Sequence, residues 1–120
     1  MGESMCKYLP QMILDITNTD LNRVMRSHKN FVLIDVRSAI ECAQTGTIPG
    51  ALNLDLQDGS FEAAIPTLSR SKTYYFVCDS GFRSAHACRL MNKAGFHIVY
   101  NIEGGMTLWS KYDTEMRKVA

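Results

Sequence analysis

The chain has 120 residues, which is the size of one ordinary domain and leaves no room for a second hydrophobic core. Hydrophobic residues make up 46% and charged residues 21%, and the formal net charge of +1 argues against nucleic acid or an anionic membrane as a partner. No apolar stretch approaches the ~20 residues that cross a bilayer, and the N-terminus has no secretory signal pattern. We therefore expect a cytoplasmic protein with a flexible segment at residues 1–9 and a single domain at residues 10–120.

The first apolar runs predict two strands with a helix between them. "QMILDIT" (11–17) is a strand pattern, and the polar cluster at residues 17–20 is typical of a helix start. "NFVLIDV" (30–36) is nearly all apolar and rich in β-branched residues, which is typical of a strand buried on both faces of a parallel sheet. We expect residues 30–36 to form the central strand. The helix before it carries four residues at helical spacing: Leu21, Val24, Met25 and His28.

The next part of the chain predicts two helices separated by a turn and a short strand. Ser38 and Glu41 form a capping box, in which each side chain bonds an otherwise unpaired backbone N–H, so we expect a helix over residues 38–45. "TIPGALNL" (47–54) combines a Pro-Gly turn with a short strand. The segment "DGS" (58–60) then caps a helix whose apolar residues are Phe61, Ala64, Ile65 and Leu68.

The last part of the chain predicts two more strands, each followed by a helix. "KTYYFV" (72–77) and "FHIVYNI" (96–102) are the strand patterns. The helix after residue 77 has its apolar residues at i, i+3, i+4 and i+7, and a final helix follows Gly104 and Gly105. Strands that alternate with helices predict an α/β fold with a mostly parallel five-stranded sheet and helices on both faces. In such a sheet, ligands bind beyond the carboxyl ends of the strands.

Four cysteines, Cys6, Cys42, Cys78 and Cys88, are too scattered for a zinc site, because they include no C-x-x-C pair and have no histidine at ligand spacing. A disulfide framework is not expected in a cytoplasmic chain of this size. The neighbours of Cys42 and Cys88 predict packed thiols, with a resolving role as the alternative for Cys88. Cys6 is expected in a mobile tail that is open to oxidation. Cys78 is therefore the candidate reactive cysteine.

Cys78 ends a predicted buried strand directly before a predicted helix. A helix N-terminus presents unpaired N–H groups and a partial positive charge, which stabilise a thiolate and lower its pKa. Arg83 adds a full positive charge, and Gly81 tolerates the left-handed dihedrals that let residues 79–82 curl their N–H groups around the sulfur. This combination favours a reactive thiol over a cysteine that merely ends the strand.

The segment "CDSGFRS" (78–84) resembles the active-site loop of single-domain members of the rhodanese-homology family, which read C-x-x-G-x-R-S or C-x-x-G-x-R-T. Three further segments resemble the family's D-V-R, G-H-I-P-G-A-x-N and x-G-G-x-x-x-W stretches in the same order. They are "LIDVR" (33–37), "GTIPGALN" (46–53) and "IEGGMTLW" (102–109). The resemblance covers about residues 11 to 112.

The resemblance implies a thiosulfate or persulfide sulfurtransferase that needs no metal or organic cofactor. Cys78 takes sulfane sulfur from a small donor as a persulfide and passes it to a thiol, cyanide or protein acceptor. Arg83 is expected to orient the loop and draw in anions, or else to pin loop carbonyls, and Ser84 to cap the helix. We expect Asp35 and Arg37 to form a structural pair that braces neighbouring loops. The substrate-binding loop is expected to comprise Asp79, Ser80, Gly81, Phe82, Arg83 and Ser84.

Two residues depart from the family's usual pattern. Thr47 stands where His is usual, and Asp79 places a carboxylate beside the candidate nucleophile, where it should repel a dianion such as thiosulfate more than a persulfide of lower charge. A non-catalytic binding or regulatory module of the same fold is therefore an alternative. Phosphatases and arsenate reductases of related architecture read C-x5-R. The C-x4-R spacing of Cys78 and Arg83 makes a ring too tight for phosphate, which disfavours that alternative.

Overall fold

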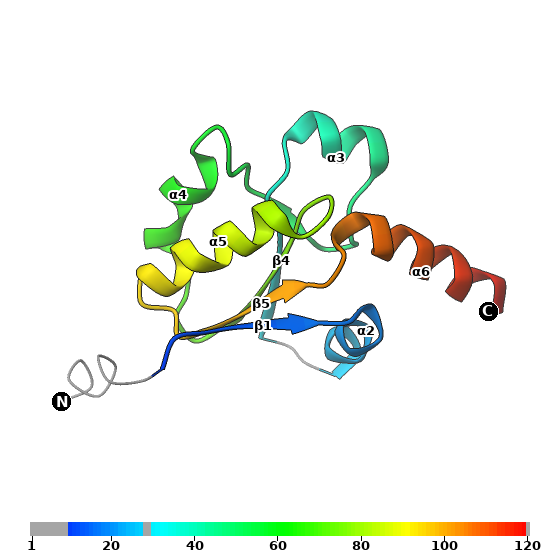
Figure 1. The fold of residues 1–120 in the computed structure, drawn as a ribbon, viewed down its shortest axis with the longest axis horizontal. Helices are drawn as coiled ribbons and strands as arrows, with labels where there is room; N and C mark the ends of the chain where they lie inside the picture. The colour runs from blue at the N-terminus through cyan, green and yellow to red at the C-terminus, as the bar shows by residue number, and fades with distance from the viewer. Residues whose placement is uncertain (1–9, 28–29, 120) are drawn as a thin grey trace.

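The computed structural model describes residues 10–27 and 30–119 and confirms the α/β fold (Figure 1). The five strands are β1 (Met12–Ile16), β2 (Phe31–Asp35), β3 (Leu52–Asn53), β4 (Thr73–Val77) and β5 (Ile98–Ile102). The helices are α2 (Asn18–Ser27), α3 (Ala39–Thr45), α4 (Ser60–Ala64), the short 3₁₀ helix η1 (Ile65–Thr67), α5 (Phe82–Lys93) and α6 (Gly105–Val119). The predictions made for residues 1–9, which include Cys6, and for His28 lie outside the described residues.

All strand pairings are parallel, and the order β1-β5-β4-β2-β3 places β4 in the middle of the sheet. The prediction that residues 30–36 form the central strand is therefore wrong. Strand β2 has β4 on one side, but only Leu52 and Asn53 pair with it on the other. The residues directly before Leu52 form a turn, which is closed by a hydrogen bond from the N–H of Ala51 to the carbonyl of Ile48.

Helices cover both faces of the sheet, as the sequence pattern predicts. Helices α4 and α5 pack on one face, and α2 and α6 pack on the other (Figure 1). Helix α5 contributes Ala87, Cys88 and Met91 to the first core. The second core receives Leu21 from α2 and Trp109 from α6. Burial on both sides explains why the inner strands are continuous apolar runs in the sequence.

The capping box predicted for the helix at residues 38–45 is present at the start of α3. The Ser38 hydroxyl oxygen accepts from the Glu41 N–H at 3.2 Å, and the Glu41 carboxylate accepts from the Ser38 N–H at 3.2 Å. At the other end, the N–H of Gly46 donates to the carbonyl of Cys42, and Gly46 has a φ of +76°. Both ends of α3 are thus fixed by local signals that the sequence carries.

Asp35, the last residue of β2, forms a buried ion pair with Arg37, with 2.8 Å between Arg37 Nη2 and Asp35 Oδ2. The guanidinium also donates to the Thr45 hydroxyl at 2.7 Å and to the Gly46 carbonyl at 2.8 Å. Burial acts to raise the pKa of Asp35, but bonds from Arg37 and from the Thr47 hydroxyl (2.6 Å) outweigh it and lower this pKa. The pair braces the end of β2 against the end of α3, as predicted.

The helix predicted from residues 58–60 onward is shorter than expected. Helix α4 ends at Ala64, and the chain continues as a 3₁₀ helix that contains Pro66. Proline lacks the N–H that an α-helix needs in its interior, so the α-helix gives way at this point. At its start, the Asp58 carboxylate accepts from the N–H of Ser60 at 2.8 Å, but the residue at the cap position is Gly59 and no side chain makes a capping bond.

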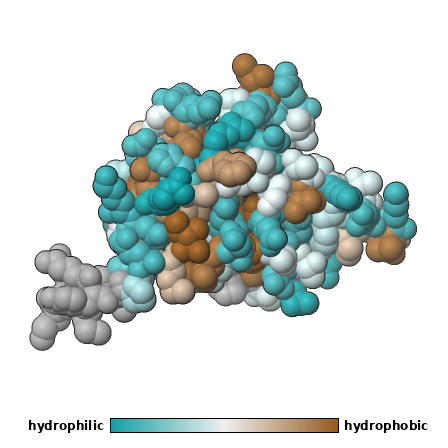
Figure 2. Space-filling view, viewed as in Figure 1, coloured by the Kyte–Doolittle hydropathy of each residue, from teal (hydrophilic) through white to brown (hydrophobic). Residues whose placement is uncertain are grey.

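Polar side chains cover most of the face seen in Figure 2, where apolar side chains form separate patches. Large apolar side chains that stay exposed are spread over several elements, including Ile40 on α3, Phe82 on α5 and Val119 on α6. Among residues 10–27 and 30–119, no helix is both long enough and apolar enough to cross a membrane.

The buried ion pair yields a stability prediction. Replacing Arg37 by Met leaves the Asp35 carboxylate buried without its partner, so we expect a loss of about 3–5 kcal/mol in the free energy of unfolding. The matched control is Arg117→Met, which removes the exposed pair of Arg117 and Asp113 (3.0 Å) and should lose less than about 1 kcal/mol. Urea denaturation measures both. Equal losses in the two variants would contradict the bracing role of Arg37.

Candidate functional site

Cys78 lies immediately after β4, at the carboxyl edge of the sheet, and its side chain is buried with 1% of its surface exposed. Its sulfur accepts a hydrogen bond from the N–H of Gly81 at 3.0 Å. The Ser84 hydroxyl lies 3.2 Å from the same sulfur. Cys78 therefore sits at the strand-to-helix corner that the sequence predicts, with polar groups of the loop turned toward the sulfur.

The loop reaches this shape through one glycine. Gly81 has a φ of +110°, which side chains of L-residues rarely adopt, and α5 begins at the next residue, Phe82. The left-handed turn directs the N–H of Gly81 back to Cys78. The outer side of the loop faces solvent, because Asp79 and Ser80 are exposed and Phe82 is 82% exposed.

Ser84 has a different role from the predicted one. We expected it to cap the helix, but it is the third residue of α5, and the residue at the cap position is Gly81, which makes no side-chain capping bond. The buried Ser84 hydroxyl instead donates to Asn101 Oδ1 at 2.6 Å, while Asn101 Nδ2 donates to the Gly81 carbonyl at 3.2 Å. Asn101 was not among the site residues predicted from the sequence. The available signal was an asparagine within an otherwise apolar strand pattern.

Arg83 has a partner that the sequence did not predict. Its guanidinium forms a two-pronged ion pair with the Glu41 carboxylate at 2.7 and 2.8 Å, in place of the alternative bonds to loop carbonyls. This pair holds the pKa of Glu41 at about 2 and raises that of Arg83. Arg83 thus ties the start of α5 to the start of α3, and most of its charge is neutralised there.

The pKa of the Cys78 thiol is set by burial and by hydrogen bonds. Burial acts to raise it, but the Ser84 hydroxyl and the N–H groups of Ser84, Gly81 and Ser80 together lower it below the ordinary value for cysteine. The sequence also predicted a lowered pKa for Cys78, but the positive charge of Arg83, which was expected to contribute, is not among the main causes of the shift. Burial without such donors raises the pKa of Cys88 to about 12, in agreement with a packed thiol.

Cys42, also predicted to be a packed thiol, is only partly buried. Burial is the main cause that raises its pKa, followed by the negative charge of Asp35. In residues 10–27 and 30–119, no group of three or more His, Cys, Asp or Glu side chains is placed to hold a metal ion. Of the three cysteines that the structure describes, Cys78 is therefore the one with a lowered pKa.

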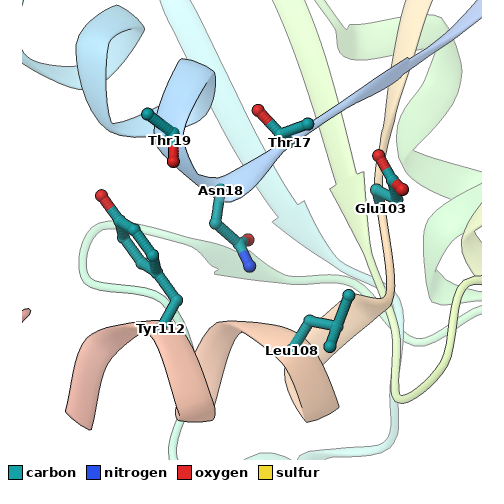
Figure 3. A pocket seen from close by; sticks show the side chains of 6 residues that line it. All are labelled: Thr17, Asn18, Thr19, Glu103, Leu108 and Tyr112. Atoms are coloured by element: carbon teal, nitrogen blue, oxygen red, sulfur yellow. The ribbon is translucent and has the colours of Figure 1, made fainter. Parts of the chain in front are cut away.

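A separate cavity of about 210 Å³ lies between the start of α2 and helix α6 (Figure 3). The side chain of Asn18 extends toward α6 in this view, and its Oδ1 is buried without a hydrogen-bond partner. No residue of the loop at 78–84 lines the cavity, and the sequence predicted no function for the residues that do. Its lining residues are Thr17, Asn18, Thr19, Glu103, Leu108 and Tyr112.

Comparison with known proteins agrees with this geometry. A model of the Rhodanese-like domain family matches residues 17–112. This chain belongs to that family. It is 36% identical over 97 residues to the Bacillus subtilis (strain 168) protein named "Putative sulfurtransferase YtwF", a match that covers 81% of this chain and 90% of the relative. A protein of Allochromatium vinosum named "Sulfurtransferase" is 28% identical over 101 residues, which covers 84% of this chain and 92% of the relative.

Solved structures also resemble this rhodanese-like chain. The human single-domain sulfurtransferase TSTD1 matches it with a TM-score of 0.67 and 26% identity. That match covers 81% of this chain and 95% of the human chain. The resemblance inferred from the four sequence segments is therefore confirmed.

The departure at Thr47 has a structural consequence in this rhodanese-like domain. Its hydroxyl donates to Asp35 Oδ2 at 2.6 Å, at a position where the family usually has His. A threonine hydroxyl therefore supplies the bond that helps to keep the buried carboxylate ionised. Thr47 belongs to the brace behind the site and makes none of the hydrogen bonds to the Cys78 sulfur found here.

The first turn of α6 holds the backbone of the loop. The N–H of Met106 donates to the Cys78 carbonyl at 2.8 Å, and the N–H and hydroxyl of Thr107 donate to the Asp79 carbonyl at 3.1 and 3.0 Å. Gly105, with a φ of +58°, lets α6 approach this closely, because a Cβ there would overlap the carbonyl groups of Cys78 and Asp79. The N-termini of α5 and α6 therefore meet at one cysteine.

This close approach predicts a strong effect of Gly105→Ala. The added methyl group meets fixed backbone atoms in addition to the left-handed strain, so we expect at least about 2 kcal/mol of lost stability. Gly50→Ala is the matched control, since Gly50 also has a positive φ (+87°) but has open space around it, and should lose about 1 kcal/mol. Thermal unfolding followed by circular dichroism compares them. Similar losses in both variants would show that the contact of α6 with the loop is not tight.

Proposed function

We propose that this rhodanese-like domain is a sulfurtransferase that moves sulfane sulfur from thiosulfate or a persulfide donor to a thiol or cyanide acceptor through a persulfide on Cys78. The observation that carries the proposal is a thiol whose pKa is lowered by hydrogen bonds at the junction of β4 and α5. The names of the bacterial relatives and of the human structure, each a sulfurtransferase, support the same class of reaction.

In the first step, the Cys78 thiolate attacks the outer sulfur of the donor. A new Sγ–S bond forms, and the S–S bond of the donor breaks. The leaving group, sulfite when the donor is thiosulfate, departs with the electron pair of that bond. The negative charge moves from Sγ to the outer sulfur of the persulfide. The N–H groups of Ser80 and Gly81, which bond Sγ, are the nearby donors proposed to stabilise this charge.

In the second step, a thiolate or cyanide attacks the outer sulfur of the persulfide. The Sγ–S bond breaks, and its electron pair returns to Cys78 as a thiolate. The hydrogen bonds that lower the pKa of Cys78 also make it a better leaving group, because they stabilise the charge that reappears on Sγ. The same donors therefore assist both halves of the cycle.

The six loop residues have distinct proposed roles. Gly81 and Ser84 contact the sulfur directly, and Arg83 fixes the start of α5 through Glu41. Asp79, Ser80 and Phe82 are exposed at the outer side of the loop, where an approaching donor or acceptor meets them. Charge and shape on this outer side are proposed to select among small anions, persulfides and protein thiols.

A non-catalytic binding module is the second candidate function. The burial of Cys78 favours it, because a donor must reach the sulfur of a residue that is only 1% exposed. Sulfur transfer to the cysteine distinguishes the two functions, since a binding module of this kind carries no transferred sulfur.

The assignment of Cys78 predicts a simple mass result. After incubation with thiosulfate or with a low-molecular-weight persulfide, the parent protein should gain one sulfur atom, and Cys78→Ser should not. The matched control is Cys42→Ser, which removes a partly buried thiol of raised pKa and should keep the gain. Intact-mass spectrometry makes the measurement. A sulfur gain that survives in Cys78→Ser contradicts the assignment, and no gain in the parent with any donor favours the binding module.

The exposed carboxylate of Asp79 predicts a donor preference. A dianion such as thiosulfate is repelled more strongly than a donor of lower charge, but exposure to water limits the effect to about fivefold at low ionic strength. Asp79→Asn should therefore shift the ratio of kcat/KM values toward thiosulfate, and salt should shrink the shift. Glu115→Gln, which neutralises an exposed carboxylate on α6, should leave the ratio unchanged. A ratio that does not move in Asp79→Asn rules out this role.

A further inference from the structure

Asn101 is a buried polar residue on β5 whose side chain bonds two parts of the Cys78 loop. Its Nδ2 donates to the Gly81 carbonyl, and its Oδ1 accepts from the Ser84 hydroxyl. The Gly81 carbonyl can only accept, so the amide nitrogen must face it, and the amide oxygen must face Ser84. The orientation of the Asn101 amide is thus fixed by its neighbours.

This orientation determines where the Ser84 proton lies. A serine hydroxyl has one proton to donate, and an amide oxygen can only accept. The distance of 2.6 Å from Ser84 Oγ to Asn101 Oδ1 therefore directs the Ser84 hydroxyl hydrogen toward Asn101 Oδ1, while Cys78 Sγ lies 3.2 Å from the same hydroxyl. In this arrangement, the Cys78 thiol donates its own proton to Ser84, and the chain of hydrogen bonds is complete.

The thiolate needs the opposite arrangement. When the S–H bond of Cys78 breaks and its proton passes to solvent, the sulfur can only accept, and the N–H of Gly81 already donates to it. For the Ser84 hydroxyl to add its own hydrogen bond, it must turn its hydrogen from Asn101 to the sulfur, which leaves a buried amide oxygen without that donor. Asn101 Oδ1 and the Cys78 thiolate therefore compete for one hydrogen bond from the Ser84 hydroxyl.

We infer that Asn101 is a positioning residue that holds the Ser84 hydroxyl proton away from the sulfur and so opposes formation of the Cys78 thiolate. The inference rests on the proposed function only in that Cys78 is taken as the reactive group. Its consequence is a two-position hydroxyl: Ser84 bonds Asn101 when Cys78 carries its proton, and bonds the sulfur when Cys78 is charged. The hydrogen bonds of Ser84 are complete when Cys78 is a neutral thiol, and rotation of this one hydroxyl adapts them to the thiolate.

The other titratable groups near Cys78 are paired, buried or exposed, and none of them bonds Ser84 or Asn101. Helix α5 carries Arg83, which pairs with Glu41 of α3. It also carries Cys88, and burial raises the pKa of this thiol to about 12. In the loop, Asp79 is exposed. At the end of β2, Asp35 pairs with Arg37, and the residues of α6 that bond the loop, Met106 and Thr107, do not titrate.

The test is the pKa of Cys78 in Asn101→Leu, which keeps the number and branching of the side-chain heavy atoms but removes the competing acceptor, together with the amide donor to the Gly81 carbonyl. Thiolate absorbance against pH is recorded for each protein and for the same protein carrying Cys78→Ser, so that the difference reports Cys78 alone. We expect the pKa to fall by about half a unit, equivalent to roughly three times more thiolate below the pKa. This readout needs no sulfur transfer, so its result is independent of whether the proposed function holds.

A second background shows whether the effect passes through Ser84. In Ser84→Ala, the pKa should rise because the sulfur loses a donor, and adding Asn101→Leu should then change nothing. Thr107→Val is the matched control for loosening of the loop, since it removes another side-chain bond to a loop carbonyl without touching Ser84, and it should leave the pKa in place.

Several results would overturn the inference. A pKa that rises or stays constant in Asn101→Leu means that Asn101 only braces the loop, and a fall that persists in the Ser84→Ala background means that it acts by another route. If Asn101→Leu does not fold, as judged by circular dichroism, Asn101→Asp is measured instead. The carboxylate is a stronger acceptor for the Ser84 hydrogen and also adds a negative charge, so the pKa must rise and the rise must be smaller in the Ser84→Ala background. A pKa that is unchanged or lower, or a rise of equal size in Ser84→Ala, rejects the inference.

Discussion

The parallel arrangement of β4 and β5 is the constraint on which the site depends. Because the two strands are neighbours and run in the same direction, the helices that follow them begin at the same edge of the sheet. Helix α5 brings the N–H of Gly81 to the Cys78 sulfur, and α6 brings the N–H of Met106 to the carbonyl of the same residue. Two helix N-termini therefore fix one cysteine from opposite ends.

The same arrangement decides how the site controls charge. Arg83 forms an ion pair with Glu41, so the thiolate is stabilised by short-range hydrogen bonds more than by a nearby free cation. Hydrogen bonds inside a buried site are screened less by salt than surface charges are, so the pKa of Cys78 depends mainly on local geometry. The buried pair of Asp35 and Arg37 contributes indirectly, because it holds the end of α3, the helix that presents Glu41.

Local features were predictable from the sequence, and long-range partners were not. The capping box of Ser38 and Glu41 and the corner at Cys78 are encoded within a few neighbouring residues, and both are present. The pairing of Glu41 with Arg83 joins residues 42 positions apart, and only the fold shows that the two helix starts meet. For the same reason, the sequence placed β2 at the centre of the sheet. It carried no sign that only two residues of β3 would pair beside it.

Two cysteines of one core show what separates a reactive thiol from a packed one. Cys78 and Cys88 belong to the same apolar cluster and are almost equally buried, yet the pKa of Cys78 is lowered and that of Cys88 is raised. Burial acts in the same direction on both, so exposure does not explain the difference. Cys78 sits where a chain leaving the sheet still has unpaired N–H groups, whereas Cys88 lies inside α5, where backbone N–H groups are already bonded within the helix. The position of a cysteine relative to the start of a helix, more than its depth, therefore determines its chemistry here.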